Sequence, residues 1–459
     1  MDALTAAIGS STRQVGAIGI LAVVSLLVAL GAGESAPVGA TLAVVGIACS
    51  FVFPIGVAAF TLAVVPFAFE LHPLPGGGYS LLELGLAWTV AGVGLRFLTR
   101  PRQLLRRVGA AATRYPWITV AAGTLLIATL VSVLALPEDA HRSEALREVR
   151  RVVVEPIAFV AVLLLLDLRQ RERTWLVTGL LTGGVVSSMV ALSQLFDADA
   201  GVIADSVTRL TGPYSHPNNL ALYLERIAAL AVPAAILISG RLRMALIGSL
   251  ALMSLALALT FSRGGWLGFA AAVAVMLLVL QRYRWLIWMA VAGLLAAIPG
   301  AIFLRERILD LGGASDEPTR FAIWRSTRVM ILDSPWTGVG PDQFLYQYGR
   351  RYVEPIGWPE RYTSHPHNLV LDFAVRLGVG GFAALASMVA AAVAGAISGL
   401  KAIRTDTVRL GSLGALVAGF VHGLIDNSYF LPDLSVLFWT CLLLLWLDPA
   451  SSDEAEMRL

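Results

Sequence analysis

Long apolar stretches separated by short polar connections dominate the chain. Stretches such as 15–33 and 267–280 are apolar at nearly every position and show no alternation of polar and apolar residues. Strands of a membrane β-barrel alternate, whereas a helix that meets lipid or other helices on every side is apolar all round. About 20 such residues cross a bilayer as a helix. The pattern therefore predicts an all-α, polytopic membrane protein.

The predicted spans number twelve to fourteen, because the second and third are short and are split by Pro54. Composition agrees: 57% of the 459 residues are hydrophobic and 14% are charged, against about 25% charged residues in soluble proteins. A water-soluble globule is thereby excluded. The predicted spans cover residues 14–33, 37–53, 55–70, 80–98, 116–136, 152–170, 174–195, 218–240, 243–261, 264–281, 283–303, 367–399, 408–425 and 434–447.

Basic residues in the short connections predict the orientation. Cytoplasmic connections carry an excess of arginine and lysine. Residues 137–151 carry four arginines on the predicted outer side and disagree with this rule, but five connections against one favour the assignment. The long connection 304–366 is predicted to lie outside, because long loops cross the membrane largely regardless of charge. The basic connections, which fall at every second position, are 100–114, 169–173, 241–243, 282–284 and 401–409.

This topology divides the chain into three parts. Residues 1–303 form the N-terminal transmembrane helices, 304–366 form a long extracytoplasmic (periplasmic) loop, and 367–459 form the C-terminal transmembrane helices and a cytoplasmic tail. The net charge of +3 is scattered among the loops, so it makes no nucleic-acid patch. Cys49 and Cys441 lie in apolar stretches and are interpreted as small hydrophobic residues.

Two groups of polar residues lie where predicted spans reach the outer side. Arg263 sits at a membrane boundary beside Gly264 and Gly265, and an arginine there usually has a specific partner because it is costly to desolvate. A snorkelling arginine that marks the interface is the alternative. Tyr214, His216 and Asn219 precede or open the span 218–240, where a helix-entry turn and a substrate contact are equally consistent with the pattern.

Two more groups lie in or beside the long loop. Arg320, Trp324 and Arg328 recur at helical spacing, so one helix face carries guanidinium groups that match phosphate oxygens. An amphipathic helix on the bilayer surface is the alternative. The segment Ser364-His365-Pro366-His367-Asn368 places a histidine at the outer boundary, where it can accept a proton near neutral pH. Helix capping and metal binding are rivals, but His365 and His367 have poor helical spacing for two metal ligands.

Two further residues, His422 and Asp426, lie one helical turn apart near the outer end of the span 408–425. They are interpreted as bonding each other or neighbouring helices. No paired-carboxylate motif with a clear outward position is found in the sequence.

Taken in their order along the chain, these motifs resemble those of the O-antigen ligase and O-antigen polymerase superfamily of bacterial envelope glycosyltransferases. The most specific match is a histidine and a small polar residue followed by two small residues at fixed spacing, here His367, Asn368, Gly378 and Gly381. The resemblance covers residues 200–445. The other matching parts are Ser262-Arg263-Gly264, Arg320, Trp324 and Gly338-Val339-Gly340.

Members of this superfamily transfer a glycan from undecaprenyl diphosphate to an acceptor hydroxyl on the outer face of the inner membrane. The resemblance implies a GT-C-like fold and an inverting reaction that needs neither a metal nor another cofactor. It implies that Arg263 and Arg320 hold the diphosphate and that His367 activates or orients the acceptor hydroxyl. The residues expected to contact substrates are Tyr214, His216, Asn219, Trp324, Arg328, His365 and Asn368.

A ligase that transfers the glycan to lipid A-core is the favoured prediction. A polymerase that extends the glycan on its own lipid carrier is the nearest alternative, and a flippase or transporter of lipid-linked sugar is the alternative from another class. The flippase predicts broken helices and charges at mid-membrane, whereas the polar groups here gather at outer ends. The expected partners are the lipid-linked glycan, an acceptor lipid or glycan, and membrane lipids, with the active site outside the bacterial inner membrane.

Overall fold

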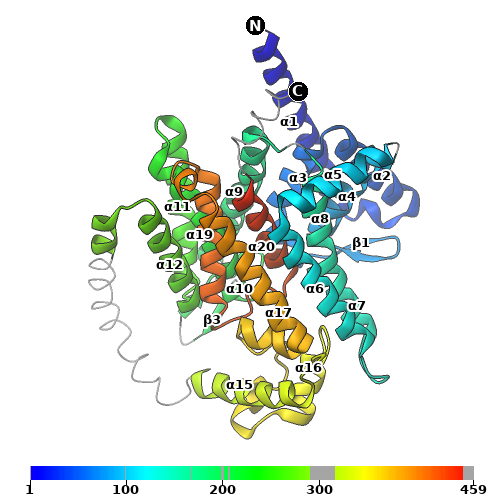
Figure 1. Ribbon diagram of the computed structural model, residues 1–459, viewed down its shortest axis with the longest axis vertical. Coiled ribbons are helices and arrows are strands. Elements are labelled where there is room, and N and C mark those ends of the chain that lie inside the picture. Colours follow the sequence, from blue (N-terminus) through cyan, green and yellow to red (C-terminus); the bar gives the residue numbers. More distant parts are fainter. Residues whose placement is uncertain are drawn as a thin grey trace.

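The computed structural model describes residues 2–98, 100–166, 168–197, 201–204, 207–289 and 316–447. These residues form a helical bundle with two short antiparallel hairpins (Figure 1). The hairpins pair β1 (His72–Leu74) with β2 (Gly77–Tyr79), and β3 (Val202–Ala204) with β4 (Val207–Arg209). Helices α15 and α16 lie together at one end of the bundle, and the beginning of α1 lies at the other end.

Most of the helices coincide with predicted spans, and five others form within predicted connections. In the first part of the chain they are α1 (Asp2–Ala29), α2 (Ala36–Val52), α3 (Pro54–Ala63), α4 (Leu81–Leu98), α5 (Pro101–Arg114), α6 (Pro116–Leu134), α7 (Arg142–Glu148), α8 (Glu155–Leu164) and α9 (Gln170–Ser193). In the second part they are α10 (Pro217–Leu237), α11 (Arg241–Leu259), α12 (Arg263–Val279), α15 (Asp316–Asp333), α16 (Phe344–Gln347), α17 (Leu369–Ile397), α18 (Leu400–Ile403), α19 (Thr407–His422) and α20 (Pro432–Trp446).

The helices confirm an all-α polytopic membrane protein. Within the described ranges, six helical segments have at least 18 residues and enough apolar character to cross a membrane. Six shorter apolar helices accompany them. The predicted span 283–303 lies mostly outside the described residues. The six long segments are 81–98, 116–134, 170–196, 217–237, 241–259 and 369–397.

The centre of the bundle is formed by α10, α19 and α20. Helix α20 is buried along nearly its whole length, and most residues of α10 and α19 are buried as well. Their apolar side chains belong to one large core cluster. Such a helix is apolar on all sides because it meets other helices rather than lipid. The polar residues at the ends of these helices are therefore fixed by a rigid core.

Arginines of the connection 137–151, which disagree with the predicted orientation, have partners inside the protein. Arg150 pairs with Glu83 of α4 and with Glu155 of α8, and Arg151 Nε lies 3.3 Å from Glu83 Oε1. Glu83 is buried, so its charge requires such partners. Arg150 and Arg151 therefore form ion pairs within the protein, which gives the basic residues of this connection a role other than setting the orientation.

Helix α17 is interrupted at Gly378, where φ is 61° and ψ is −144°. The segment 335–340 bonds the backbone groups that the interruption frees. Val339 N donates to Val375 O over 2.8 Å, and Val379 N donates to Pro335 O over 2.8 Å. A side chain at Gly378 would lie 2.5 Å from the carbonyl carbon of Trp336. The interruption therefore attaches the segment 335–340 directly to the long apolar helix α17.

We expect Gly378→Ala to lower the melting temperature in detergent. The backbone angles at this position are strained by about 1–3 kcal/mol for any residue with a side chain, and the added Cβ also meets the Trp336 backbone. The matched control is Gly123→Ala in α6, where an added Cβ meets no atom within 4 Å. Equal melting temperatures for the two variants would contradict the strained interruption.

Candidate active site

The carboxylate of Asp426 joins segments that are far apart in the sequence. His367 Nδ1 lies 3.1 Å from Asp426 Oδ1, and Asn218 Nδ2 donates to Asp426 Oδ2 over 3.0 Å. His365 Nε2 lies 3.5 Å from Asp426 Oδ1. Asp426 lies in the connection between α19 and α20. Asn218 lies at the start of α10, and the two histidines precede α17. We call Asn218, His365, His367 and Asp426 the histidine–aspartate cluster.

The hydrogen bonds of this cluster set the charge of Asp426. Burial by itself would raise the pKa of this carboxyl group, but the hydrogen bonds from His365 and His367 outweigh it and hold the pKa well below its usual range. Burial, followed by the nearby His367, lowers the pKa of His365. At neutral pH the cluster therefore contains an ionised aspartate beside a neutral His365.

The ionised aspartate orients the ring of His367. A carboxylate only accepts hydrogen bonds, so the Nδ1 of His367 that faces Asp426 carries a proton. In the neutral ring, Nε2 is then an acceptor on the opposite edge, and it lies 3.3 Å from Thr363 Oγ1. His367 has a φ of 51°, a left-handed conformation that few residues other than glycine adopt. A carboxylate that fixes a histidine in this way is the arrangement of a general base.

Arg209 connects the cluster to the turn that carries Arg263. Its Nη2 donates to Asn218 Oδ1 over 2.9 Å, and its Nε donates to Thr260 O over 2.8 Å. Thr260 immediately precedes the turn Phe261-Ser262. Ser262 caps α12 by accepting from Gly265 N, and Arg263 is the exposed first residue of that helix. Sequence reasoning missed Arg209, which lies at the end of a short strand without a motif.

The turn at Arg263 also packs against α19. A Cβ at Gly264 would lie 2.3 Å from His422 Cδ2, so only glycine permits this approach. His422 Nδ1 bonds Glu225 Oε2 over 3.0 Å, and both side chains are buried. His422 and Asp426 thus bond neighbouring elements, which is one of the two alternatives that the sequence left open. Arg263 is held near the connection that carries Asp426.

Helix α15 is attached to the histidine segment. Trp324 Nε1 donates to Pro366 O over 2.9 Å, between the two histidines. Arg320 lies one turn earlier on the same face of α15 and is half-buried. Arg328, one turn later, is exposed. The structure thereby joins α15, through Trp324, to the backbone between His365 and His367.

The other expected contact residues have different positions. Asn368 caps α17 by accepting from Leu371 N over 3.0 Å, and His216 caps α10 by accepting from Asn218 N over 3.2 Å. Tyr214 is buried and donates to Asp433 Oδ2 over 3.0 Å, outside the cluster. Asn218, which was not among the expected residues, bonds Asp426, and the expected substrate contact of the next residue, Asn219, stays a prediction.

Arg376 bonds the backbone of the segment that carries His365 and His367. It is buried, its Nη2 donates to Ser364 O over 3.1 Å, and its Nε donates to Asp372 Oδ1 over 2.7 Å. It also pairs with Glu148, whose pKa is raised by burial to about 7. Sequence reasoning missed this residue, although Asp372 and Arg376 stand four residues apart in an otherwise apolar stretch, which is a detectable signal.

The histidine–aspartate cluster also has the donor set of a metal site. One atom each from His365, His367 and Asp426 lie within 4.8 Å of one another. Two histidines and a carboxylate are ligands that suit several divalent metals. The same groups also hydrogen-bond one another, so their geometry is consistent with both a metal-free and a metal-bound cluster. The expectation that no metal takes part stays a prediction.

Comparison with known proteins gives a family match for part of the chain. No curated protein matches the chain. Residues 248–386 match the family model Wzy_C, described as O-antigen ligase. This range contains Arg263, Arg320 and His367, whereas Asn218 and Asp426 lie outside it. The match confirms that the chain resembles the O-antigen ligase superfamily, whose members carry out glycan transfer of the ligase or polymerase type.

Proposed function

We propose that the protein transfers a glycan from undecaprenyl diphosphate to an acceptor hydroxyl, such as one of lipid A-core, on the outer face of the inner membrane. The resemblance to O-antigen ligases supports glycan transfer in the membrane. The observation that carries the proposal is the 3.1 Å contact between His367 Nδ1 and Asp426 Oδ1, which makes Nε2 the proton acceptor of the ring. Thr363 Oγ1 lies 3.3 Å from Nε2, but it also donates to His365 O over 3.1 Å, so Nε2 can accept a substrate proton instead.

In this proposal His367 is the general base. Its Nε2 takes the proton of the acceptor hydroxyl as the hydroxyl oxygen forms a bond to the anomeric carbon of the donor. Asp426 holds the required tautomer and stabilises the imidazolium that results. The bond between the anomeric carbon and the diphosphate oxygen breaks, and undecaprenyl diphosphate leaves with the electron pair. Attack from the face opposite the leaving group inverts the configuration.

Arg263 and Arg320 act on the leaving group. Negative charge grows on the diphosphate as the glycosidic bond breaks, so fixed cations stabilise the transition state more than the ground state. The turn at Arg263 is held by the packing of Gly264 against His422, and the Arg320 face is held by the bond from Trp324 to Pro366. These contacts hold the two helix segments that carry the arginines, which supports a role for both side chains at the diphosphate.

We expect Arg263→Ala, Arg320→Ala and His367→Ala each to lower the transfer rate at least about 100-fold, because each removes a charge or a base used in the transition state. The measurement is glycan transfer by purified protein in vesicles with lipid-linked glycan and acceptor. The matched control is Arg325→Ala, since Arg325 lies on α15 but pairs with Glu354 at the surface. Wild-type rates in all three variants would contradict the assigned roles.

The product of the same assay separates the related activities. A single transfer of the whole glycan supports a ligase, and a ladder of increasing length supports a polymerase. Movement of the donor across the membrane without a new glycosidic bond would contradict both and support a flippase.

We expect Asp426→Asn to lower kcat about 100-fold or more while KM for the donor changes little, because the variant keeps the size of the side chain but not the charge that orients His367. The double variant with His367→Ala is expected to be no slower than His367→Ala alone, since residues that act as one unit are not additive. Rate losses that multiply would show that Asp426 acts independently of His367.

Removal of divalent metals is expected to leave the transfer rate unchanged, because neither the base nor the arginines require a metal. The measurement compares protein treated with a chelator with the same protein after zinc or magnesium is restored. A loss of activity that the metal reverses would instead assign His365, His367 and Asp426 as metal ligands, and His365→Ala should then abolish metal binding measured directly.

A further inference from the structure

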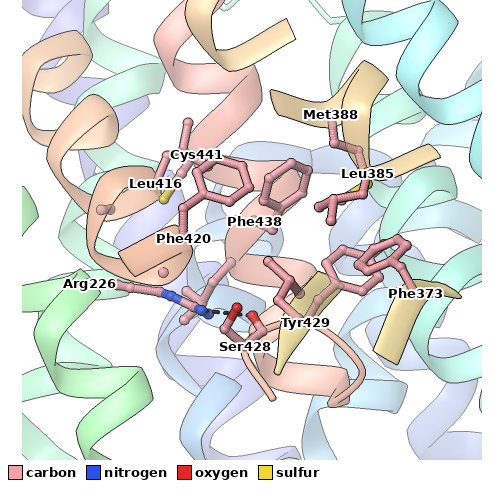
Figure 2. A pocket seen from close by; sticks show the side chains of 14 residues that line it. Arg226, Phe373, Leu385, Met388, Leu416, Phe420, Ser428, Tyr429, Phe438 and Cys441 are labelled. Carbon is pink, nitrogen blue, oxygen red and sulfur yellow. Dashed lines mark hydrogen bonds between the residues drawn. The ribbon is translucent and has the colours of Figure 1, made fainter. Parts of the chain in front are cut away.

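The connection between α19 and α20 carries Asp426, and α10 holds it on both sides of that residue. Glu225 Oε2 lies 3.0 Å from Nδ1 of His422, the last residue of α19. Arg226 Nη2 donates to Ser428 O over 2.7 Å, as the dashed line in Figure 2 shows. Two consecutive residues of α10 therefore bond the chain four residues before and two residues after the carboxylate of the histidine–aspartate cluster.

Both side chains reach their partners because neighbouring helices carry glycine beside them. A Cβ at Gly419 of α19 would lie 2.6 Å from Arg226 Nε, so the guanidinium crosses α19 where no side chain stands. A Cβ at Gly268 of α12 would lie 2.5 Å from Glu225 Oε2. These close approaches fix the two charged groups between α10, α12 and α19.

The segment that carries His367 holds the same connection from another direction. Leu369 N donates to Gly423 O over 2.6 Å, and Asn368 Nδ2 donates to Leu424 O over 2.8 Å. The distance between His367 Nδ1 and Asp426 Oδ1 is 3.1 Å, and a shift of about 0.5 Å would end such a hydrogen bond. The position of the connection between α19 and α20 therefore decides whether this bond forms.

Stability alone does not account for two charged residues at this place. Glu225 and Arg226 are buried in α10, which is long and apolar enough to cross a membrane. Charged groups in such helices are costly and mark functional positions. Apolar side chains of similar size often stabilise a core as well as buried charges do, or better. What the two charged groups supply here is bonds that fix the connection on both sides of Asp426.

We propose that Glu225 and Arg226 are positioning residues that hold Asp426 at hydrogen-bond distance from His367. They act through Asp426 and not on the substrates. This rests on the proposed function, in which Asp426 orients His367 as the general base. When either bond from α10 is lost, one side of the connection is free to shift, and the ring of His367 loses the carboxylate that fixes its tautomer.

The first test removes the bond from α10 to Ser428. Arg226→Met is expected to lower kcat for glycan transfer at least about tenfold with little change in KM for the donor, because small misplacements of catalytic groups are costly. The matched control is Arg409→Met. Arg409 is also buried, and its Nε donates to Leu445 O over 2.9 Å, but it lies at the opposite end of α19 from Asp426. Equal losses of kcat in the two variants would overturn the proposal.

A double variant tests whether Arg226 acts through Asp426. Arg226→Met combined with Asp426→Asn is expected to be no slower than Asp426→Asn alone, because residues that act as one unit are not additive. Losses that multiply would show that Arg226 acts on the reaction by another route and would overturn the proposal.

A second variant displaces the guanidinium but keeps every charge, so it also serves if Arg226→Met does not fold. Gly419→Ala places a Cβ against Arg226 Nε and is expected to lower kcat as Arg226→Met does. The matched control is Gly411→Ala in the same helix, where a Cβ would lie 2.8 Å from the backbone oxygen of Leu230 on α10. A loss of kcat in Gly411→Ala as large as in Gly419→Ala would assign the effect to general packing and overturn the proposal.

The last test does not depend on glycan transfer. Full-length Arg226→Met and Gly419→Ala proteins are examined by cryo-electron microscopy in lipid nanodiscs. We expect the distance between His367 Nδ1 and Asp426 Oδ1 to increase from 3.1 Å to more than about 3.5 Å. An unchanged distance in both variants would overturn the proposal. A displaced Asp426 with an unchanged transfer rate would support the positioning role and contradict the proposed function of His367 and Asp426.

Discussion

A buried, ionised carboxylate determines how the end of the bundle around Asp426 is arranged. Asp426 is almost completely buried, and such a charge is tolerated only when hydrogen-bond donors surround it. Those donors come from the start of α10 through Asn218, from the segment before α17 through His367, and from the backbone of Asn427. The need to satisfy one acid therefore brings three distant parts of the chain to one place.

Much of the fold was predictable from the sequence because each membrane span is a local property of about twenty residues. The predicted 80–98 corresponds to α4, and the predicted 218–240 corresponds to α10. The interruption of α17 was not predicted. Gly378 stands in an apolar stretch that also contains Gly380 and Gly381, and hydropathy does not distinguish a glycine that continues a helix from one that breaks it.

The candidate site was predictable in its parts but not in its connections. Arg263, Arg320 and His367 stand out because charged or titratable groups are rare near membrane boundaries. Asp426 was assigned to a helix with His422, whereas α19 ends at His422 and the following turn directs the carboxylate to His367. Arg209 reaches Thr260 across 51 residues, and no local pattern reveals a contact over such a separation.

The interruption at Gly378 also limits how the protein can change in evolution or by engineering. The amides of Val339 and Gly340 and the carbonyl of Pro335 complete hydrogen bonds that belong to the backbone of α17. The segment 335–340 and α17 are consequently one structural unit, although they are separate in sequence. A chimera that exchanges the connection 304–366 between relatives keeps this unit intact only if the 335–340 segment and the glycine-containing part of α17 are transferred together.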